Sequence, residues 1–222
     1  MDIQIKSCLE GAKEAKGIAV VIDVFRASNT MIAMLGQGIE YIVPIGDLKH
    51  AYMLKNEHPS YLLFGERKGL PPKGFDYGNS PAQASKLDLR GKRAIITTSA
   101  GSQGIVNAHN ADEILIGSFA NAHAIADYIK RKNPKKVSLI AIGFEANEKA
   151  EEDEQCALYL KGLLEGQTPE FNAMKKEILE SDGANRLRRL NQEDDLEFAL
   201  KLDTYKIAPR AVKGNGNLIV QL

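Results

Sequence analysis

The first two thirds of the chain alternate short apolar runs with segments of helical periodicity. The apolar runs are continuous rather than interleaved with polar residues, which is typical of strands in a sheet covered on both faces. These runs are residues 18–22, 41–45, 61–64, 94–96, 114–116 and 137–142. Segments with helical spacing lie between them, at residues 28–35, 48–56, 103–109 and 122–132. This order predicts an α/β fold, a three-layer α/β/α sandwich with a largely parallel or mixed sheet.

Polar residues mark where some of these helices start. Asp47 and Asn121 directly precede helical segments and are predicted N-caps. Ser80 followed by Pro81 combines a cap with a proline in the favoured first-turn position, which predicts a further helix start.

The last third of the chain has a different character. From about Asp153 the sequence is highly charged and mostly helical, and breaks at residues 166–169 and 181–183 predict about three helices. A strand-like run at residues 217–221 is expected to return to an edge of the sheet. Because no repeat or linker divides the sequence, we expect a single domain over residues 1–222 with a helix-rich C-terminal part.

Composition narrows the classes of function. Of the 222 residues, 44% are hydrophobic, which is enough for a sizeable core. Basic and acidic residues both number 29, whereas a nucleic-acid binder normally carries a basic excess. Two cysteines without a spacing pattern predict neither a disulfide framework nor a zinc site. No segment resembles a signal peptide or a membrane span, so we expect a cytoplasmic protein without nucleic-acid or membrane partners.

Polar or glycine-rich residues follow five of the six predicted strands. In sheets of this type, ligands collect at the carboxyl ends of the strands. Asp23 directly follows a buried strand, where its carboxylate is costly to desolvate unless a cation or hydrogen bonds compensate. It is therefore a candidate metal ligand or general base, and equally a candidate helix cap or partner of Arg26.

Two further segments carry candidate chemistry. The loop at residues 97–104 offers hydroxyls and glycines that open into a helix, an arrangement that favours an anion such as phosphate, although such loops also simply cap helices. Glu152 and Asp153 lie in an acidic run that is either solvated or supplies a hard cation, since Mg²⁺ needs only one or two carboxylates.

A set of motifs in this order resembles the 2-phosphosulfolactate phosphatase family. The most specific are Gly-Glu-Arg-Lys-Gly at 65–69 and Phe-Asp-Tyr-Gly-Asn-Ser-Pro at 75–81. Others are Asp-Val-Phe-Arg-Ala at 23–27, Thr-Thr at 97–98, Gly-Ser-Phe-Ala-Asn at 117–121, and Glu-Asp at 152–153 with Cys156. The similarity runs from about residue 18 to residue 165, with weaker similarity near Asp195 and Pro209.

The resemblance implies a Mg²⁺-dependent phosphomonoester hydrolase with an α/β/α fold that forms oligomers, which we expect to be homodimers. The family's namesake reaction removes phosphate from 2-phospho-3-sulfolactate, a step of coenzyme M biosynthesis. We therefore expect a small anionic organophosphate as substrate, either 2-phosphosulfolactate or a related phospho-hydroxy acid.

The resemblance also assigns expected roles to residues of this chain. The expected Mg²⁺ ligands are Asp23, Asp76, Glu152 and Asp153. Arg26 and Arg67 are expected to bind the two anionic ends of the substrate, as arginine suits bidentate recognition of oxyanions, and Glu66 is the candidate general base. The remaining expected substrate contacts are Asn79, Ser80, Thr97, Thr98, Ser99, Gly101, Ser102 and Asn121.

Some positions depart from the family pattern. Where family members usually read Thr-Thr-Asn-Gly-Thr, this chain reads Thr-Thr-Ser-Ala-Gly-Ser at 97–102, which alters the expected anion-binding loop. This change motivates an alternative hypothesis, a binding module for a phosphorylated or sulfonated ligand with little or no catalysis. A nucleotide-binding enzyme is a third hypothesis, but the chain lacks the glycine fingerprint of that class.

Overall fold

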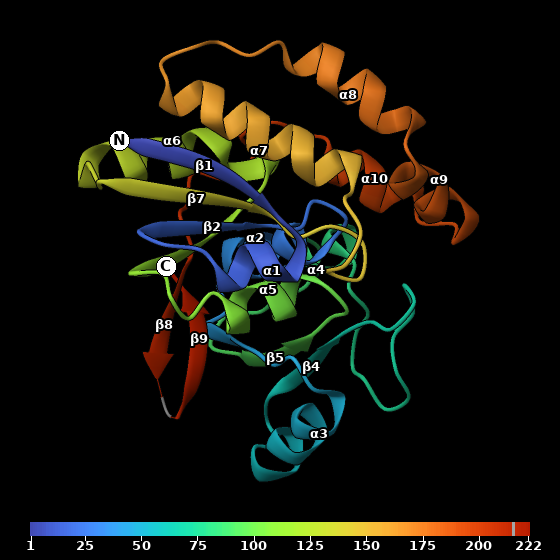
Figure 1. The fold of residues 1–222 in the computed structure, drawn as a ribbon. Coiled ribbons are helices and arrows are strands. Elements are labelled where there is room, and N and C mark those ends of the chain that lie inside the picture. The colour runs from blue at the N-terminus through green and yellow to red at the C-terminus, as the bar shows by residue number, and fades with distance from the viewer. Residues whose placement is uncertain (215) are drawn as a thin grey trace.

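The computed structural model describes residues 1–214 and 216–222 and shows an α/β fold built on one mixed sheet (Figure 1). The strand order within this sheet is β1-β7-β2-β6-β8-β9-β3-β5-β4. The strands are β1 (Asp2–Ser7), β2 (Ile18–Ile22), β3 (Tyr41–Pro44), β4 (Leu62–Gly65), β5 (Arg93–Thr97), β6 (Glu113–Gly117), β7 (Lys136–Ala141), β8 (Arg210–Gly214) and β9 (Asn217–Gln221). The predicted fold class is therefore confirmed.

The helices connect the strands and make up most of the C-terminal part. They are α1 (Cys8–Lys13), α2 (Ala27–Gly36), α3 (Leu48–Glu57), α4 (Pro81–Ala84), α5 (Gly101–Asn107), the 3-10 helix η1 (Phe119–Asn121), α6 (Ala122–Lys132), α7 (Glu151–Leu164), α8 (Phe171–Glu180), α9 (Asp182–Arg189) and α10 (Glu193–Ala199). In the part of the chain that the structure describes, no helix combines the length and apolar character needed to cross a bilayer.

The sheet consists of two parallel groups joined by an antiparallel hairpin. Strands β1, β7, β2 and β6 are mutually parallel, as are β3, β5 and β4. The hairpin β8–β9 lies between the groups and runs across the direction of β1, β7 and β2 (Figure 1). It pairs with β6 through Ala211 and Arg210, and with β3 through Val220 alone.

Each parallel group is covered by helices on both faces, and the two groups share the helices between them. One apolar cluster joins Val21 of β2 and Ile96 of β5 to buried residues of α2 and α5, which lie between the groups (Figure 1). A second cluster packs the outer face of β2 and β7 against α6 and α7, and a third packs β3 and β5 against α3. This shared middle layer explains why all but the last residue of α2 are buried.

Several predicted elements match the structure closely, and the differences have physical reasons. The runs at 18–22 and 217–221 are β2 and β9, and the segment at 122–132 is α6. Strand β1 was not predicted because Ile3 and Ile5 alternate with polar residues, the pattern of an edge strand with exposed positions. Strand β8 was also missed, since it is short and only partly buried.

Two expectations for the C-terminal part were wrong. Strand β9 does not lie at an edge of the sheet, because its hairpin partner β8 inserts with it between β6 and β3. The region from 151 to 199 contains four helices rather than three, since a turn around Asn191, which has a positive φ of 53°, separates α9 from α10.

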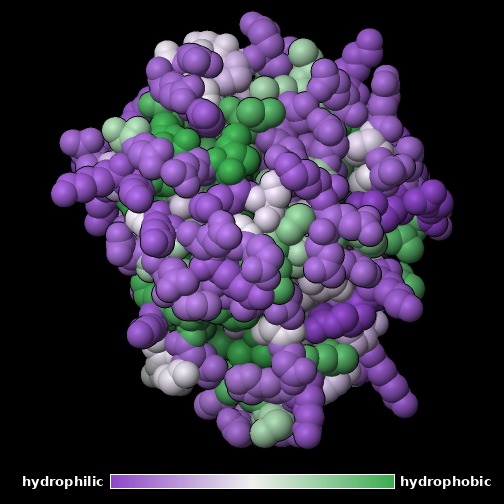
Figure 2. All heavy atoms as spheres, viewed as in Figure 1, coloured by the Kyte–Doolittle hydropathy of each residue, from purple (hydrophilic) through white to green (hydrophobic). Residues whose placement is uncertain are grey.

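On the face seen in Figure 1, the surface is mostly hydrophilic with small separate apolar patches (Figure 2).

The predicted caps had mixed outcomes. The side chain of Asp47 accepts a hydrogen bond from the backbone N–H of His50, and Ser80 accepts one from Gln83, so both are N-caps. Asn121 stands at the cap position of α6, but its side chain makes no capping bond there. It accepts a hydrogen bond from the backbone N–H of Ser118 instead.

Candidate active site

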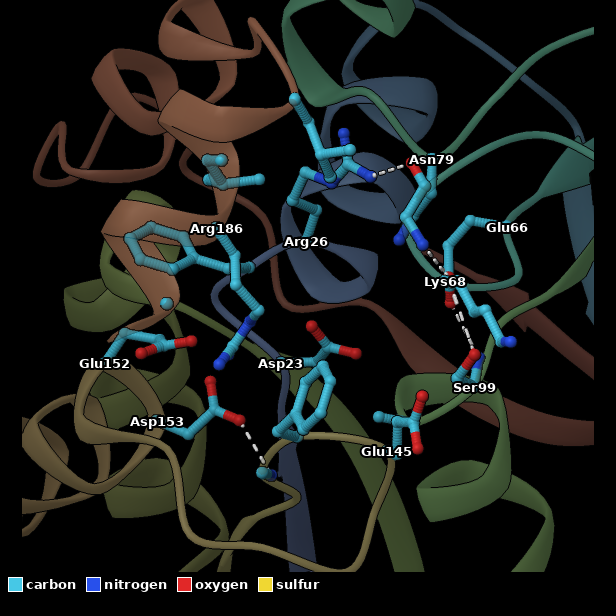
Figure 3. Close-up of a pocket in the computed structure, with 18 residues that line it drawn as sticks. Asp23, Arg26, Glu66, Lys68, Asn79, Ser99, Glu145, Glu152, Asp153 and Arg186 are labelled. Carbon is cyan, nitrogen blue, oxygen red and sulfur yellow. Dashed lines mark hydrogen bonds between the residues drawn. The ribbon is translucent and has the colours of Figure 1, made fainter. Parts of the chain in front are cut away.

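A cavity of about 360 Å³ lies at the carboxyl ends of strands β2, β4, β5 and β7. Side chains from distant parts of the chain meet there: Glu152, Asp153 and Arg186 on one side, and Glu66, Lys68, Asn79 and Ser99 on the other, with Asp23 and Arg26 between them (Figure 3). The other lining residues are Phe25, Gly69, Ala100, Gly143, Phe144, Glu145, Gly183, Leu187 and Leu190.

Asp23 lies at the floor of this cavity and is 5% exposed. Its Oδ1 accepts a hydrogen bond of 3.1 Å from the backbone N–H of Ala27, at the start of α2. Burial, and then the nearby Glu66 carboxylate, raise the pKa of Asp23 to about 6, although the N–H groups of Ala27 and Gly101 oppose the shift. Gly101 is required at this point, since a Cβ there would stand 2.7 Å from Asp23 Oδ2.

Glu152 and Asp153 enter the cavity from the first turn of α7 and are 2% and 3% exposed. Asp153 accepts backbone hydrogen bonds from Val24 at 2.7 Å and Gly143 at 2.9 Å, whereas Oε2 of Glu152 has no hydrogen-bond partner among the described residues. Burial, and then Asp23, raise the pKa of Glu152 to about 7 despite the opposing charge of Arg186. Burial and the neighbouring carboxylates of Asp23 and Glu152 also raise the pKa of Asp153 well above its usual range. Full ionisation of these three carboxylates therefore requires more positive charge than the protein itself places beside them.

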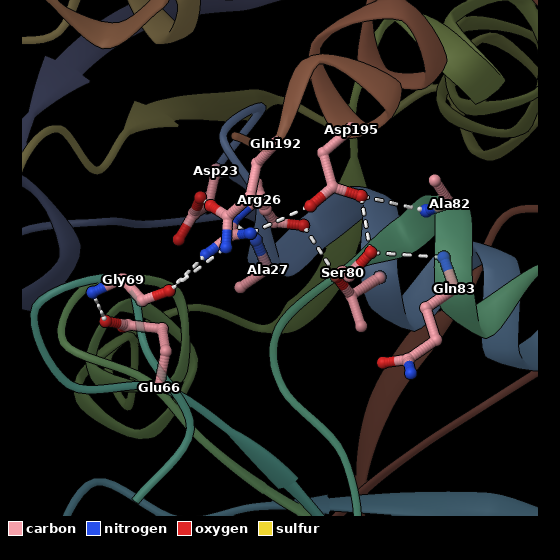
Figure 4. Close-up of polar contacts among 11 residues, drawn as sticks. Asp23, Arg26, Ala27, Glu66, Gly69, Ser80, Ala82, Gln83, Gln192 and Asp195 are labelled. Atoms are coloured by element: carbon pink, nitrogen blue, oxygen red, sulfur yellow. Dashed lines mark hydrogen bonds and ion pairs between the residues drawn. The ribbon is translucent and has the colours of Figure 1, made fainter. Parts of the chain in front are cut away.

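Arg26 is a buried cation held in place by Asp195 of α10 and by the loop at Gly69 (Figure 4). Its Nη1 donates to Oδ2 of Asp195 at 2.8 Å, and its Nη2 donates to the carbonyl of Gly69 at 2.9 Å. The other oxygen of Asp195 accepts hydrogen bonds from Ser80 Oγ at 2.5 Å and the backbone N–H of Ala82 at 3.1 Å. Asp195, on α10, thus fixes the guanidinium and the start of α4 together.

Glu66 joins two loops of the cavity. Its Oε1 accepts a hydrogen bond of 2.7 Å from the backbone N–H of Ser99, and its Oε2 accepts one of 2.9 Å from Gly69. Both oxygens are therefore occupied by backbone N–H groups. This arrangement orients the two loops that bring Lys68 and Ser99 to the rim of the cavity (Figure 3).

Arg186 is a cavity residue that the sequence did not single out. Its guanidinium carbon lies 4.0 Å from the centroid of the Phe144 ring, which positions the charge beside Glu152. A lone arginine in a charged helical segment carries no motif, so nothing in the sequence marked it. Asp195 lies where the chain only weakly resembles the family and was given no role, since only the fold brings it next to Arg26 across 169 residues.

The expected site residues divide into two groups. Seven of them line the cavity: Asp23, Arg26, Glu66, Asn79, Ser99, Glu152 and Asp153. Asn79 is 4% exposed, and its Oδ1 has no hydrogen-bond partner among the described residues. That oxygen is therefore a buried acceptor that the described residues leave unsatisfied.

Asp76 and Arg67 do not line the cavity. The carboxylate of Asp76 accepts hydrogen bonds from the backbone N–H of Leu63 at 2.7 Å and from Lys55 at 3.2 Å, so it fastens the loop to β4 and α3. The guanidinium of Arg67 donates to Thr97 Oγ1 at 2.9 Å and lines a shallower neighbouring groove, which shares Ser99 with the cavity.

The other expected contacts are mostly turned into the protein, although Thr98 also lines the groove beside Arg67. Thr98 and Ser102 are each 1% exposed and hydrogen-bond to one another at the start of α5. The hydroxyl of Ser80 donates a hydrogen bond to Asp195, and the amide of Asn121 donates to the carbonyls of Ile116 and Ile207. Gly101 packs against Asp23, and Thr97, fully buried, accepts from Arg67. None of these six residues lines the cavity.

Comparison with known proteins identifies the family of this chain. The family model described as 2-phosphosulpholactate phosphatase matches residues 4–214. A probable 2-phosphosulfolactate phosphatase of Caldicellulosiruptor saccharolyticus is 36% identical, over 83% of this chain and 85% of that protein. Proteins with the same description from Thermoplasma volcanium and Carboxydothermus hydrogenoformans are 34% and 30% identical, over 92% and 100% of this chain and 95% and 98% of their own. The chain therefore belongs to the 2-phosphosulpholactate phosphatase family of phosphomonoester hydrolases, as its motifs predicted.

Proposed function

We propose that this protein is a Mg²⁺-dependent phosphatase that hydrolyses a small anionic phosphomonoester, 2-phosphosulfolactate or a related phospho-hydroxy acid. One observation carries the proposal. Three buried carboxylates and two guanidinium groups, drawn from segments 23–26, 152–153 and 186, converge in one cavity. Family membership supplies the reaction class, and the relatives' descriptions supply the first substrate to test.

The donor chemistry of the cavity fits Mg²⁺. Among the described residues, no three His, Cys, Asp or Glu side chains stand ready to enclose a metal ion. Mg²⁺ does not require such a cage, since it commonly takes one or two carboxylates together with waters and substrate oxygens. The unpartnered Oε2 of Glu152 and the raised pKa values of Asp23 and Glu152 mark oxygens that lack a compensating cation. We propose Asp23 and Glu152 as ligands, with Asp153 beside them.

Bound there, Mg²⁺ would neutralise phosphoryl charge and help orient the attacking water. Two arginines of the protein would stabilise the remaining phosphoryl charge. Arg26 is preorganised by Asp195 and Gly69, and Arg186 stands on Phe144 across the cavity, so both guanidinium groups bind phosphoryl oxygens without reorganising during the reaction.

Of the two carboxylates considered as general base, Asp23 suits the role better than Glu66. Glu66 already accepts a backbone hydrogen bond at each oxygen, which makes it a positioning group for the loops at Gly69 and Ser99. Asp23 acts as proton acceptor through the carboxylate oxygen that does not hold Mg²⁺; its pKa of about 6 is that of the metal-free protein, and a bound cation would lower it. Attack by Asp23 itself on the phosphorus is an alternative route that oxygen-isotope labelling of the carboxylate distinguishes.

Phosphate release from 2-phosphosulfolactate and 2-phospholactate, with Mg²⁺ or with EDTA, tests the proposal. We expect release that requires Mg²⁺. If these ligands raise the melting temperature but no phosphate appears, the protein is a binding module instead. That alternative draws on the inward-facing hydroxyls of Thr98 and Ser102, which leave the cavity with fewer donors than the sequence suggested. The proposed homodimer is checked separately by light scattering.

A further inference from the structure

A second hollow, which we call the acidic groove, adjoins the candidate active site. Its volume is about 660 Å³, and it lies where the start of α7, the end of α8 and the start of α9 come together (Figure 1). It shares four lining residues with the active-site cavity: Phe144, Glu152, Gly183 and Arg186. The two spaces are therefore neighbours that share one wall.

The acidic groove has a large excess of acidic side chains. Two cations line it, Lys149 and Arg186, against six carboxyl groups, those of Glu148, Glu151, Glu152, Glu177, Glu180 and Asp182. Lys149 is 3.5 Å from Glu154, which lies outside the groove. Gln155 donates hydrogen bonds to Glu151 at 2.7 Å and to Glu177 at 2.8 Å, and so holds α7 and α8 together. Because like charges gathered in this way repel one another, the acidic groove attracts cations.

Glu152 connects the acidic groove with the proposed metal site. It is 2% exposed, and its Oε2 has no hydrogen-bond partner among the described residues. Gly183 makes room for this side chain, since a Cβ on that glycine would stand 2.5 Å from each of the two carboxylate oxygens. A buried oxygen without a partner is unfavourable, and a cation that arrives from either space would satisfy it.

The acidic groove suits a hydrated cation rather than a bare one. Among the described residues, no three His, Cys, Asp or Glu side chains are placed to enclose a metal ion. Its carboxylates therefore act through the waters that Mg²⁺ gives up reluctantly. A cleft lined by one sign of charge raises the local concentration of counter-ions and their association rate. Since Asp23 and Arg26 line only the active-site cavity, an ion in the groove reaches Glu152 without first passing them.

We propose that the acidic groove is a loading site for hydrated divalent cations, which collects Mg²⁺ from solution and delivers it to Glu152. This inference rests on the proposed Mg²⁺ site and adds the route by which the ion arrives. The exposed carboxylates of the groove act by long-range attraction, so they set the rate of Mg²⁺ association and its dependence on salt. The ligands Asp23 and Glu152 set the rate of dissociation instead.

Stopped-flow mixing of the full chain with Mg²⁺ and a fluorescent magnesium indicator measures both rates without any turnover. The test variant combines Glu177→Gln and Glu180→Gln, which change exposed side chains of α8 outside the active-site cavity. At about 0.01 M ionic strength, where the Debye length is about 30 Å, we expect association at least ~3-fold slower and dissociation changed by less than ~1.5-fold. At about 1 M, where the Debye length is about 3 Å, the difference in association should disappear.

A second double variant removes the same amount of charge elsewhere. Glu57 ends α3, at the opposite end of the molecule from α8, and Asp112 directly precedes β6 (Figure 1). Glu57→Gln with Asp112→Asn should leave the association rate within about 1.5-fold of that of the unaltered protein, because these charges lie far from Glu152. Equal slowing in the two double variants would reduce the effect to net charge and overturn the proposal. Unchanged association in the variant of α8 would overturn it as well.

The same measurements separate this inference from the proposed function. If the unaltered protein takes up Mg²⁺ and releases phosphate, but the variant of α8 binds Mg²⁺ just as fast, only the loading role fails. If the unaltered protein takes up no Mg²⁺, the proposed Mg²⁺ dependence fails, and the loading role fails with it.

Discussion

Asp195→Asn is the perturbation with the sharpest consequences. The ion pair between Asp195 and Arg26 is 2.8 Å long, and its two side chains are 3% and 4% exposed. Asparagine keeps an oxygen that can accept from Ser80 and Ala82, but it removes the charge that faces the guanidinium. Breaking a buried pair by removing one partner costs about 3–5 kcal/mol. Because the retained acceptor offsets part of this loss, we expect about 3 kcal/mol, or a fall in melting temperature of roughly 6–12 °C.

The effect on catalysis is separable from the effect on stability. Without Asp195 the guanidinium of Arg26 keeps only the Gly69 carbonyl, and a misplacement of about 1 Å can lower the rate ~10²-fold. We therefore expect kcat/KM to fall by about that factor per folded molecule. In an Arg26→Ala background, Asp195→Asn should lower kcat/KM no further and should restore stability, since no unpaired charge remains buried.

The neighbouring Asp194→Asn is a matched control on the same helix. Asp194 is 82% exposed and only 3.9 Å from Lys86, so its removal should change neither kcat/KM nor the melting temperature measurably. Folded Asp195→Asn protein with the kcat/KM of the unaltered protein would refute the positioning role. Independent, additive losses in the double variant would refute it as well.

Three further predictions concern the cavity. Asp23→Asn should lower kcat at least ~10²-fold in a phosphate-release assay, whereas Asp76→Asn, which alters a carboxylate outside the cavity, should reduce stability but retain most of the turnover. Because the pKa of Glu152 rises from 4.5 to about 7 on folding, the folded protein binds this proton more tightly. The free energy of unfolding of the metal-free protein should therefore fall by up to about 3 kcal/mol as pH rises from about 4.5 to 7. Thermal scans of the Glu152→Gln variant should show a smaller fall. A stability that rises steeply with pH in the unaltered protein but not in the variant would contradict this. Arg186→Ala should weaken inorganic phosphate binding by about 10-fold or more in calorimetry, while the exposed Arg188→Ala should not.

The sequence was most informative where function depends on chain order. A carboxylate directly after a buried apolar run must lie at a strand end, and Asp23 does so after β2. The same reasoning put Glu66 and Ser99 at neighbouring strand ends, and both line the cavity. The fold class followed from the continuous apolar runs for the same reason, since only strands buried on both faces lack polar alternation.

The sequence was least informative where the direction of a side chain decides whether it reaches the cavity. Asp76 lies within a specific motif, yet it points to Leu63 and Lys55 rather than into the cavity. The hydroxyls of Thr98 and Ser102 fit an anion-binding loop equally well in sequence, but they satisfy each other at the start of α5. Contacts such as Arg26 with Asp195 join segments that only the folded sheet brings together, so spacing along the chain holds no trace of them.

A crystal structure grown with Mg²⁺ and inorganic phosphate tests most directly whether the buried carboxylates and guanidinium groups form one catalytic centre. We expect the phosphate within hydrogen-bond distance of Arg26 or Arg186, and the metal ion on an oxygen of Asp23 or Glu152. Phosphate bound only in the neighbouring groove at Arg67, with the cavity holding neither ion, would contradict this account.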